Sequence, residues 1–209
     1  MKARRDVDGT RIAVWGSSFG GGHSITVASR HPELRAAVAQ CPFTDGLASA
    51  LALGPIASLK LAPVLARDLA ATVLGRAPVM IPLAGGPGSL ALMNAPDALP
   101  GYEALLPADT TFRNEAAARV APTIMAYRPG RAAKKVRFPI LFCVSNTDTV
   151  TPPAQTLQYA RTAPLGEIKR YDAGHFDFYL GEAFEELVRD QVEFLARQLH
   201  PAPAREATL

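Results

Sequence analysis

Cysteine is scarce in this sequence, whose 209 residues include only Cys41 and Cys143. Both lie in apolar runs far apart in the chain, where a buried thiol is the simplest interpretation. Their spacing matches neither a metal-binding motif nor the disulfide framework of a small secreted protein. The sequence therefore predicts no metal ion, and it implies no other cofactor.

An excess of charge of one sign is also missing. The chain has 22 Lys and Arg residues against 19 Asp and Glu residues, which gives a net charge of +3. Its basic runs are short, so they favour a solvated surface over a nucleic acid interface. With 48% hydrophobic and 20% charged residues, the composition is that of a globular domain that can bury a core.

Long unbroken hydrophobic runs are absent too. No apolar stretch follows the charged residues after Met1, so we expect no signal peptide. The longest uncharged run, residues 77–96, contains four prolines and three glycines, which would break a membrane-spanning helix. We therefore expect a cytoplasmic protein without a membrane span.

Apolar runs at residues 11–15 and 34–41 predict two strands. A glycine-rich turn and a helical pattern that ends near Arg30 separate them, and a strand, a helix and a strand in this order predict a parallel sheet. The remaining expected core elements are strands at 138–145 and 167–171 and helices at about 152–162 and 182–199.

The alternation of strands and helices stops between the second and third of these strands. Helices are expected there at residues 62–74 and 111–121. Because long loops without structure of their own are uncommon, we expect residues 43–137 to form a helical cap over one face of the sheet. The predicted domain organisation is a core of residues 1–42 and 138–200, the cap insertion 43–137, and a disordered tail at 201–209.

The turn after the first strand, Gly16-Ser17-Ser18-Phe19-Gly20, matches the pattern G-x-S-x-G between a strand and a helix. Such a turn strains the backbone of its central residue and lifts that side chain clear of the sheet, so Ser18 is the candidate nucleophile. Ser17 is expected to face away. Gly16 and Gly20 are expected to provide the space for the turn. The Phe19 backbone N–H, at the helix N-terminus, is the candidate oxyanion donor.

A glycine-rich turn can also bind phosphate or merely connect two elements. A Walker A loop requires Gly-Lys-Ser/Thr, which is absent here. The dinucleotide-binding pattern requires a third glycine at a position that Ile25 occupies. The turn therefore favours a nucleophile.

A serine hydroxyl needs a base to remove its proton. His175 lies in a loop after the last predicted strand, at the sheet edge that carries functional loops, and is the candidate base. His23 lies on the same helix as Ser18 and is expected to be a packing or surface residue. His31 is expected to cap a helix, and His200 lies near the tail.

The base in turn needs an acid that holds its tautomer and stabilises its cation. Asp148 follows the strand at residues 138–145 and is the candidate. A helix N-cap is its alternative role, although Thr151 can fill that position. Asp45 is the reserve candidate. Asp172 and Asp177 are too near His175 in sequence to orient it well, and we expect them at the surface.

These residues resemble the α/β-hydrolase family. The resemblance lies in the segments RIAVWGSSFGGG, PILFCVSNTDTVTPP and RYDAGHFDFY, and it points to the serine-hydrolase branch of dienelactone-hydrolase-like and prolyl-peptidase-like esterases. It implies a mostly parallel α/β sheet and a Ser18–Asp148–His175 triad in the chain order typical of the fold.

The sequence also departs from the family pattern in one respect. In the family the serine turn follows the fifth strand of eight, whereas only about ten residues precede the first strand here. The chain thus resembles the C-terminal part of the fold, with Met1 a mis-assigned start or the gene truncated. By analogy the second oxyanion donor, on the loop after the third strand, is missing. We therefore expect impaired activity and an exposed apolar strand edge open to self-association.

The function that follows is a serine hydrolase of carboxylic esters or related small acyl substrates (EC 3.1.1 or related). The leucine-rich stretches at residues 47–53 and 81–92 either line an apolar acyl pocket or pack on one another. Acyl transfer and peptide cleavage use the same machinery and stay open. A hydrolase remnant that only binds a ligand or partner is the alternative from another class.

Overall fold

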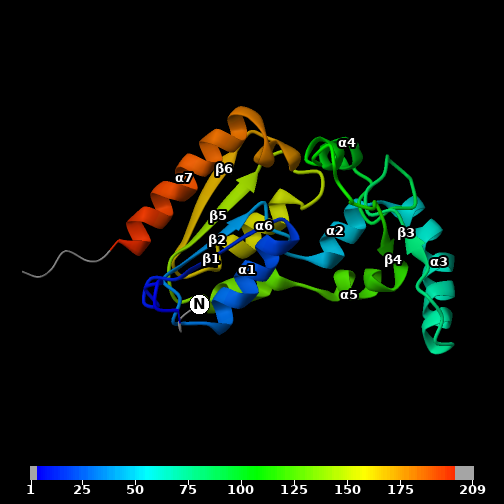
Figure 1. Ribbon diagram of the computed structural model, residues 1–209, viewed down its shortest axis with the longest axis horizontal. Coiled ribbons are helices and arrows are strands. Elements are labelled where there is room, and N and C mark those ends of the chain that lie inside the picture. Colours follow the sequence, from blue (N-terminus) through cyan, green and yellow to red (C-terminus); the bar gives the residue numbers. More distant parts are fainter. Residues whose placement is uncertain (1–3, 201–209) are drawn as a thin grey trace, which may run out of the picture.

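The computed structural model describes residues 4–200 of the chain, and the predicted tail at 201–209 lies outside the described residues. A four-stranded parallel sheet forms its centre (Figure 1). The strands are β1 (Ala13–Ser17), β2 (Ala36–Gln40), β5 (Ile140–Ser145) and β6 (Gly166–Tyr171). Their order in the sheet is β1-β2-β5-β6, so chain order and spatial order coincide. The predicted strands are all present, with ends shifted by one or two residues.

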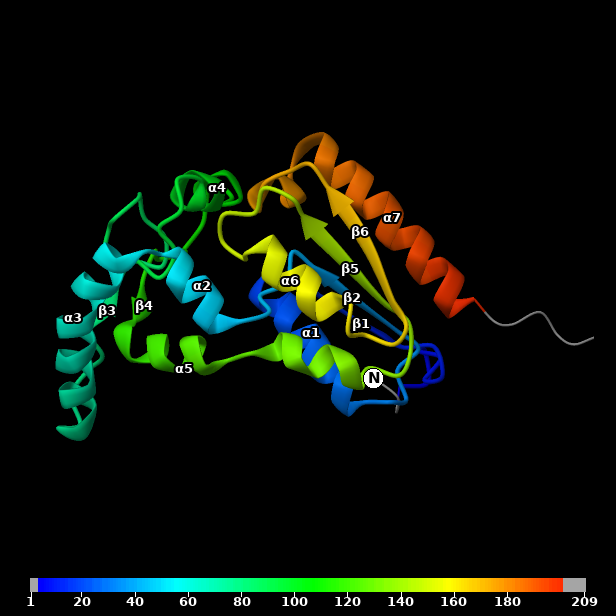
Figure 2. The ribbon, with the colours of Figure 1, turned by 180° about the vertical axis from the view of Figure 1, so that it is seen from behind.

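Helices cover both faces of the sheet, as Figure 2 shows from behind. One face carries α1 (Phe19–Arg30), the 3₁₀ helix η2 (Pro129–Lys135) and α6 (Pro153–Ala160), and the other carries the 3₁₀ helix η3 (Phe176–Tyr179) and α7 (Gly181–Leu199). Parallel strands need such crossover helices, because the chain must return to the same end of the sheet before each new strand.

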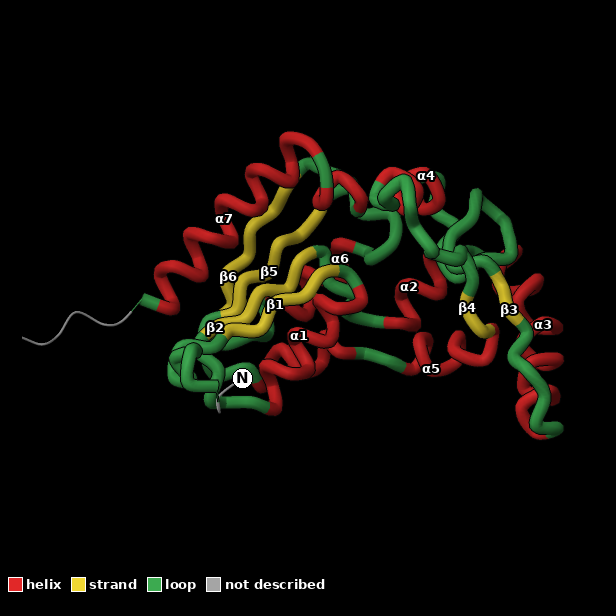
Figure 3. Tube along the Cα trace, viewed as in Figure 1, coloured by secondary structure: helices red, strands yellow, loops and turns green. Residues whose placement is uncertain are grey.

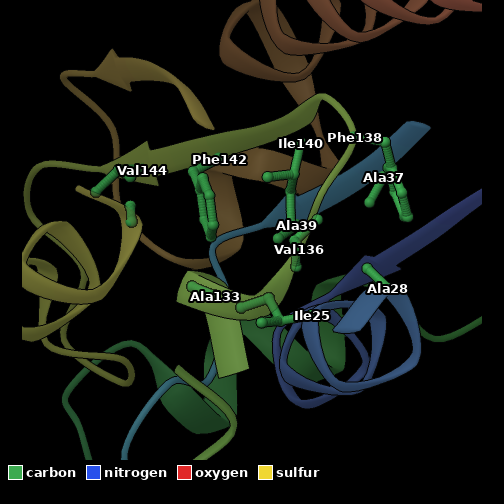
Figure 4. Close-up of a cluster of buried hydrophobic side chains, with 11 residues drawn as sticks. Ile25, Ala28, Ala37, Ala39, Ala133, Val136, Phe138, Ile140, Phe142 and Val144 are labelled. Carbon is green, nitrogen blue, oxygen red and sulfur yellow. The ribbon is translucent and has the colours of Figure 1, made fainter. Parts of the chain in front are cut away.

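The alternation of side chains along β2 and β5 divides the core in two. Ala37 and Ala39 of β2 and Phe142 of β5 point toward α1 and η2 (Figure 4). Val38 and Leu141 point the opposite way, against α7. Both strands are buried along their whole length, which explains why their sequences are apolar runs rather than alternating patterns.

Strand β1 lies at the edge of the sheet and pairs only with β2 among the described residues. This agrees with the expectation of an unpaired side. Trp15 of β1 is 53% exposed, and its indole N–H donates a hydrogen bond to Gln191 of α7 at 2.8 Å.

Residues 43–128 form a separate group of elements at one end of the molecule (Figures 1 and 3), whereas η2, which the predicted insertion 43–137 included, packs against α1 and the sheet as part of the core. The group lies beyond the carboxyl ends of the strands, whereas the sequence predicts it over one face of the sheet. The chain enters it directly from the carboxyl end of β2, which fixes this position. Its elements are α2 (Gly46–Ala52), α3 (Pro55–Val73), β3 (Met80–Ile81), α4 (Ala98–Ala104), β4 (Ala116–Ala117), the 3₁₀ helix η1 (Ala118–Val120) and α5 (Ala121–Ala126).

The helix expected at residues 111–121 is wrong. The segment instead contains β4, which pairs antiparallel with β3, so the group is not purely helical. Asn114 explains the difference: its side chain accepts from the Ala84 N–H and donates to the Ala84 carbonyl, both at 2.8 Å. These bonds hold the segment extended, and α5 begins only at Ala121, followed by Pro122, a residue that suits a helix start.

None of the helices in residues 4–200 combines the length and apolarity that a bilayer crossing requires.

Candidate active site

Ser18 occupies a strained turn between β1 and α1. Its φ of 52° lies in the left-handed region, which a residue with a side chain rarely adopts. Three backbone hydrogen bonds hold this conformation: the Ser18 N–H donates to Gln40 at 2.9 Å, and its carbonyl accepts from Phe43 at 2.8 Å and Gly22 at 3.2 Å. The turn therefore has the geometry that the G-x-S-x-G pattern predicts.

The glycines around Ser18 let the turn pack closely. A Cβ on Gly16 would lie 2.1 Å from the Gly20 carbonyl oxygen, and one on Gly22 would lie 2.3 Å from the Phe43 carbonyl oxygen. Gly20 differs from the expectation, because a Cβ there would meet nothing within 4 Å. The space that the turn requires is thus provided by Gly16 and Gly22, together with Gly21 against Pro42.

The structure places His175 beside Ser18, although 157 positions separate them in the chain. The loop after β6 brings the imidazole over the serine turn, where Nε2 lies 3.0 Å from the Ser18 Oγ. The ring is 2% exposed and contacts the edge of the Phe176 ring. Burial on this scale fixes the orientation of the ring.

Asp148 lies on the other side of the same imidazole. Its Oδ2 is 2.8 Å from Nδ1 of His175. Because an ionised carboxylate only accepts hydrogen bonds, Nδ1 carries the proton, and Nε2 is left to accept from the Ser18 hydroxyl. Ser18, His175 and Asp148 therefore form one hydrogen-bonded chain.

Asp148 does not take the helix N-cap role that the sequence left as its alternative, because Pro152 is the N-cap of α6 and no side chain caps that helix; instead the carboxylate holds the loop before α6. Its Oδ1 accepts from the backbone N–H groups of Val150 at 2.8 Å and Thr151 at 2.6 Å, and Oδ2 accepts from the Thr151 hydroxyl at 2.8 Å. These loop contacts fix the carboxylate from one side while it faces His175 on the other. Sequence reasoning missed Thr151 as this support.

The neighbours of His175 shift its pKa in opposite directions. Burial lowers the pKa of the imidazole, whereas the Cys41 sulfur and the Asp148 carboxylate raise it by more. The pKa of His175 therefore lies above its usual value of about 6.5. A raised pKa makes the imidazole a stronger base once it is neutral.

The other three histidines lie outside the hydrogen-bonded chain of Ser18, His175 and Asp148. The His23 Nδ1 is 2.9 Å from the Tyr127 hydroxyl, and its ring packs on Phe19. His31 caps the end of α1, as expected, and His200 follows α7.

The remaining carboxylates have other partners. Asp45 caps α2 by accepting from Leu47 and Ala48, and it also accepts from the Tyr159 hydroxyl at 2.7 Å. This makes the reserve candidate a structural residue. Asp172 and Asp177 are exposed, as expected.

Phe19 is the first residue of α1, so its N–H is among those for which the helix itself offers no acceptor. The Phe19 ring is 39% exposed and packs against Phe43 and Tyr127. The candidate oxyanion donor thus lies directly after Ser18 at a helix N-terminus, where the helix dipole favours negative charge.

A cavity of about 720 Å³ opens above Ser18 and Phe19. Its far wall comes from the group of elements at residues 43–128 and is mostly apolar, and both leucine-rich stretches contribute to it. The lining from these stretches is Ser49, Ala50, Ala52, Leu53, Leu83, Pro87, Gly88, Ala91 and Leu92. Thr149 and Val150, beside Asp148, complete the wall near the hydrogen-bonded chain.

A second hydrogen-bonded group lies behind the serine turn. Ser17 faces away from Ser18, as expected, and its Oγ lies 2.6 Å from the Tyr179 hydroxyl. The Cys41 sulfur lies 3.6 Å from the same Oγ. The sequence held no signal for Tyr179, because the contact depends on the fold of the loop after β6.

Cys41, Asp148 and His175 each offer a possible metal ligand within 4.8 Å of the others. Here the carboxylate and the imidazole already bind one another, and the free ring nitrogen faces Ser18. The donor set therefore fits proton transfer better than metal ligation.

Known proteins resemble this chain in sequence and in structure. A model of the prolyl oligopeptidase family matches residues 1–57. The quorum-quenching protein AidA of Acinetobacter baumannii (strain MDR-ZJ06) is 48% identical over 191 residues, which cover 91% of this chain and 63% of AidA. The chain thus spans less than two thirds of the length of that relative.

Two solved structures show the fold. The α/β hydrolase GrgF from Penicillium sp. sh18 matches with a TM-score of 0.69 at 22% identity, over 95% of this chain and 67% of its own. A monoacylglycerol lipase from Paleococcus ferrophilus matches with a TM-score of 0.60 at 23% identity, over 91% of this chain and 70% of its own. The predicted fold is therefore confirmed: the chain has the fold of these α/β hydrolases.

Proposed function

We propose that this chain is a serine hydrolase of carboxylic esters or related acyl compounds, with Ser18 as nucleophile, His175 as base and Asp148 as orienting acid. One observation carries the proposal: the hydrogen-bonded chain from the Ser18 Oγ through His175 to Asp148 ends at the floor of an apolar cavity. This arrangement supports acyl transfer, because nucleophile, base and acid each meet the partner that they require.

In the first half-reaction the Ser18 oxygen attacks the acyl carbon. His175 accepts the hydroxyl proton at Nε2, while Asp148 holds Nδ1–H and stabilises the imidazolium. The carbonyl oxygen becomes an oxyanion, to which the Phe19 N–H donates. The tetrahedral intermediate then collapses: the bond to the leaving alcohol breaks, His175 returns the proton to that oxygen, and an acyl-Ser18 ester remains.

In the second half-reaction water attacks the acyl-Ser18 ester, and His175 again accepts a proton at Nε2. When the new intermediate collapses, the bond to Ser18 breaks and the proton returns to the serine oxygen. The products are a carboxylic acid and the free enzyme, with no net change in the protein.

A fluorophosphonate probe tests the nucleophile, because it forms a covalent bond only with an activated serine. Ser18 is expected to be labelled, and Ser18→Ala to lose the label completely. The measurement is gel fluorescence of the purified chain, with the modified peptide identified by mass spectrometry.

Ser17→Ala is the matched control, because it removes the neighbouring hydroxyl, which faces Tyr179 and not His175. It is expected to label like the parent chain. Equal labelling of Ser18→Ala and the parent would refute the assignment, and loss of labelling in Ser17→Ala alone would move the nucleophile by one residue.

The cavity supports an apolar acyl group as the preferred part of the substrate. Its far wall is mostly Ala, Leu, Ile and Met side chains, and pockets of this size hold small organic ligands. AidA is named as a quorum-quenching protein, so a quorum-sensing signal that contains an acyl bond is a further candidate substrate. This candidate rests only on the sequence similarity to AidA.

A series of p-nitrophenyl esters measures this preference. From acetate to octanoate, kcat/KM is expected to rise by about fourfold per methylene, since burying one CH₂ contributes about 0.8 kcal/mol. Ala50→Trp, which fills part of the cavity, is expected to shift the preference to short acyl groups. Ala66→Trp changes an exposed alanine of α3 and is the matched control. Equal kcat/KM for acetate and octanoate in the parent chain would contradict an acyl pocket.

A further inference from the structure

Helix α3 has an apolar side that faces away from the rest of the protein. It lies at the extreme end of the molecule in both views (Figures 1 and 2). We define the outer face of α3 by its exposed residues within about one third of the helix circumference. These residues are Pro55, Leu59, Ala62, Pro63, Ala66, Leu69, Ala70 and Val73. None is charged, whereas a helix on a solvated surface normally turns its polar side outward.

Two of the apolar side chains of this face lie mostly in solvent. Leu59 is 77% and Val73 is 87% exposed. Leu51, Ile56 and Leu74 continue the apolar surface beyond the face and are also exposed. Contiguous apolar surface of this kind marks an interaction site, unlike single exposed apolar residues.

The inner side of α3 is fixed, so the helix cannot bury its outer face by rotating. Asp68 is fully buried and accepts from the Arg119 guanidinium at 2.7 Å and from the Val79 N–H at 2.7 Å. Leu61 and Leu65, on the same side, line the cavity above Ser18. Only a partner from outside this group of elements can therefore cover the outer face.

The exposed charges of the segment that contains α3 have one sign. From Gly46 to Val79, the acidic residue is Asp68, which is buried and paired with Arg119. The other charged residues of that segment, Lys60, Arg67 and Arg76, are exposed cations. Lys60 and Arg67 follow Ile56 and Pro63 by four positions, so they border the apolar face. Apolar residues bordered by cations are typical of helices that lie in the interface of an anionic membrane.

We propose that the outer face of α3 docks on an anionic lipid surface, with Leu59 and Val73 inserted among the acyl chains and the three cations at the headgroups. A second copy of this chain fits less well, because pairing two such faces would bring the Lys60, Arg67 and Arg76 cations of one copy close to the same cations of the other. Docking here would place the substrate cavity, which the inner side of α3 lines, next to the membrane.

Vesicle sedimentation tests the proposal without any need for activity. The purified chain is expected to pellet with phosphatidylcholine vesicles that contain phosphatidylglycerol, and much less with phosphatidylcholine alone. Leu59→Ser/Val73→Ser is expected to lower the partition constant at least tenfold. Arg67→Gln/Arg76→Gln is expected to lower it by about fivefold per charge, and high salt to have the same effect.

Val192→Ser is the matched control, because Val192 is an exposed valine on α7; it is expected to pellet like the parent. Folding of every variant is checked by circular dichroism. Failure of the parent to pellet, or equal pelleting of parent and Leu59→Ser/Val73→Ser, overturns the proposal. Analytical ultracentrifugation tests self-association. If the parent is a dimer and Leu59→Ser/Val73→Ser is a monomer, the proposal is also overturned, and the outer face of α3 is a self-association surface. Since Ser18→Ala is expected to bind vesicles normally, failure here is distinct from failure of the proposed function.

Discussion

Replacing His175 with alanine is expected to lower kcat for an activated ester by about 10⁶-fold, the scale of loss when a serine hydrolase loses its base. Without Nε2 at 3.0 Å, the proton on Ser18 has no acceptor in the site. Steady-state kinetics with p-nitrophenyl butyrate measure the loss. Some stability should also be lost, about 1–3 kcal/mol, because buried Asp148 keeps its backbone donors but loses its imidazole partner.

His23→Ala is the matched control for this variant. His23 lies five positions after Ser18 on α1 and contacts Tyr127 and Phe19, which makes it the histidine nearest to the serine in sequence. It is expected to change kcat by no more than a few fold. If His175→Ala kept more than a hundredth of the activity while circular dichroism showed a folded chain, His175 would not be the base.

Replacing Asp148 with asparagine is expected to lower kcat by about 10⁴-fold. The amide still accepts from Val150 and Thr151, but its NH₂ donates where the carboxylate accepted. The imidazole then turns its proton to Nε2 and can no longer take one from Ser18. The measurement is kcat, and the melting temperature shows whether the fold survives.

The same variant is expected to change the pH dependence of kcat/KM. His175 acts as a base only when neutral, so activity falls as the pH drops through its pKa. The Asp148 carboxylate raises that pKa, and its removal lowers it again. The acid limb of the residual activity should therefore move to lower pH in Asp148→Asn.

Asp45→Asn is the matched control, since Asp45 was the rival carboxylate in the sequence. It is held by Tyr159 and the start of α2, so its loss is expected to reduce stability and to leave kcat and the acid limb nearly unchanged. A loss of 10⁴-fold in Asp45→Asn, with Asp148→Asn unaffected, would reverse the two assignments.

The candidate site was predictable because each residue lies directly after a predicted strand. Parallel strands bring their carboxyl ends to one edge of the sheet, so Ser18, Asp148 and His175 had to meet there if the strands paired. The two-residue shifts at strand ends did not matter, since the loops still begin at the same edge.

The group of elements between β2 and β5 was predictable only in part. The helix expected at residues 62–74 corresponds to the C-terminal part of α3, which ends at Val73. The helix expected at 111–121 was wrong because two residues of that segment bind distant partners: Asn114 binds Ala84, and Arg119 binds Asp68. A local sequence pattern contains no signal for hydrogen bonds between residues that lie far apart in the chain. The same holds for Gly20, whose supposed lack of space depends on neighbours that the sequence does not show.

The sequence alone determined the parallel core, the strained serine turn and the order of the three candidate residues, since these follow from local periodicity and short motifs. Only the tertiary structure decided which carboxylate faces His175, how the cavity is lined and which side of α3 is left uncovered. Those features depend on contacts between residues far apart in the chain, and no short window of sequence contains them.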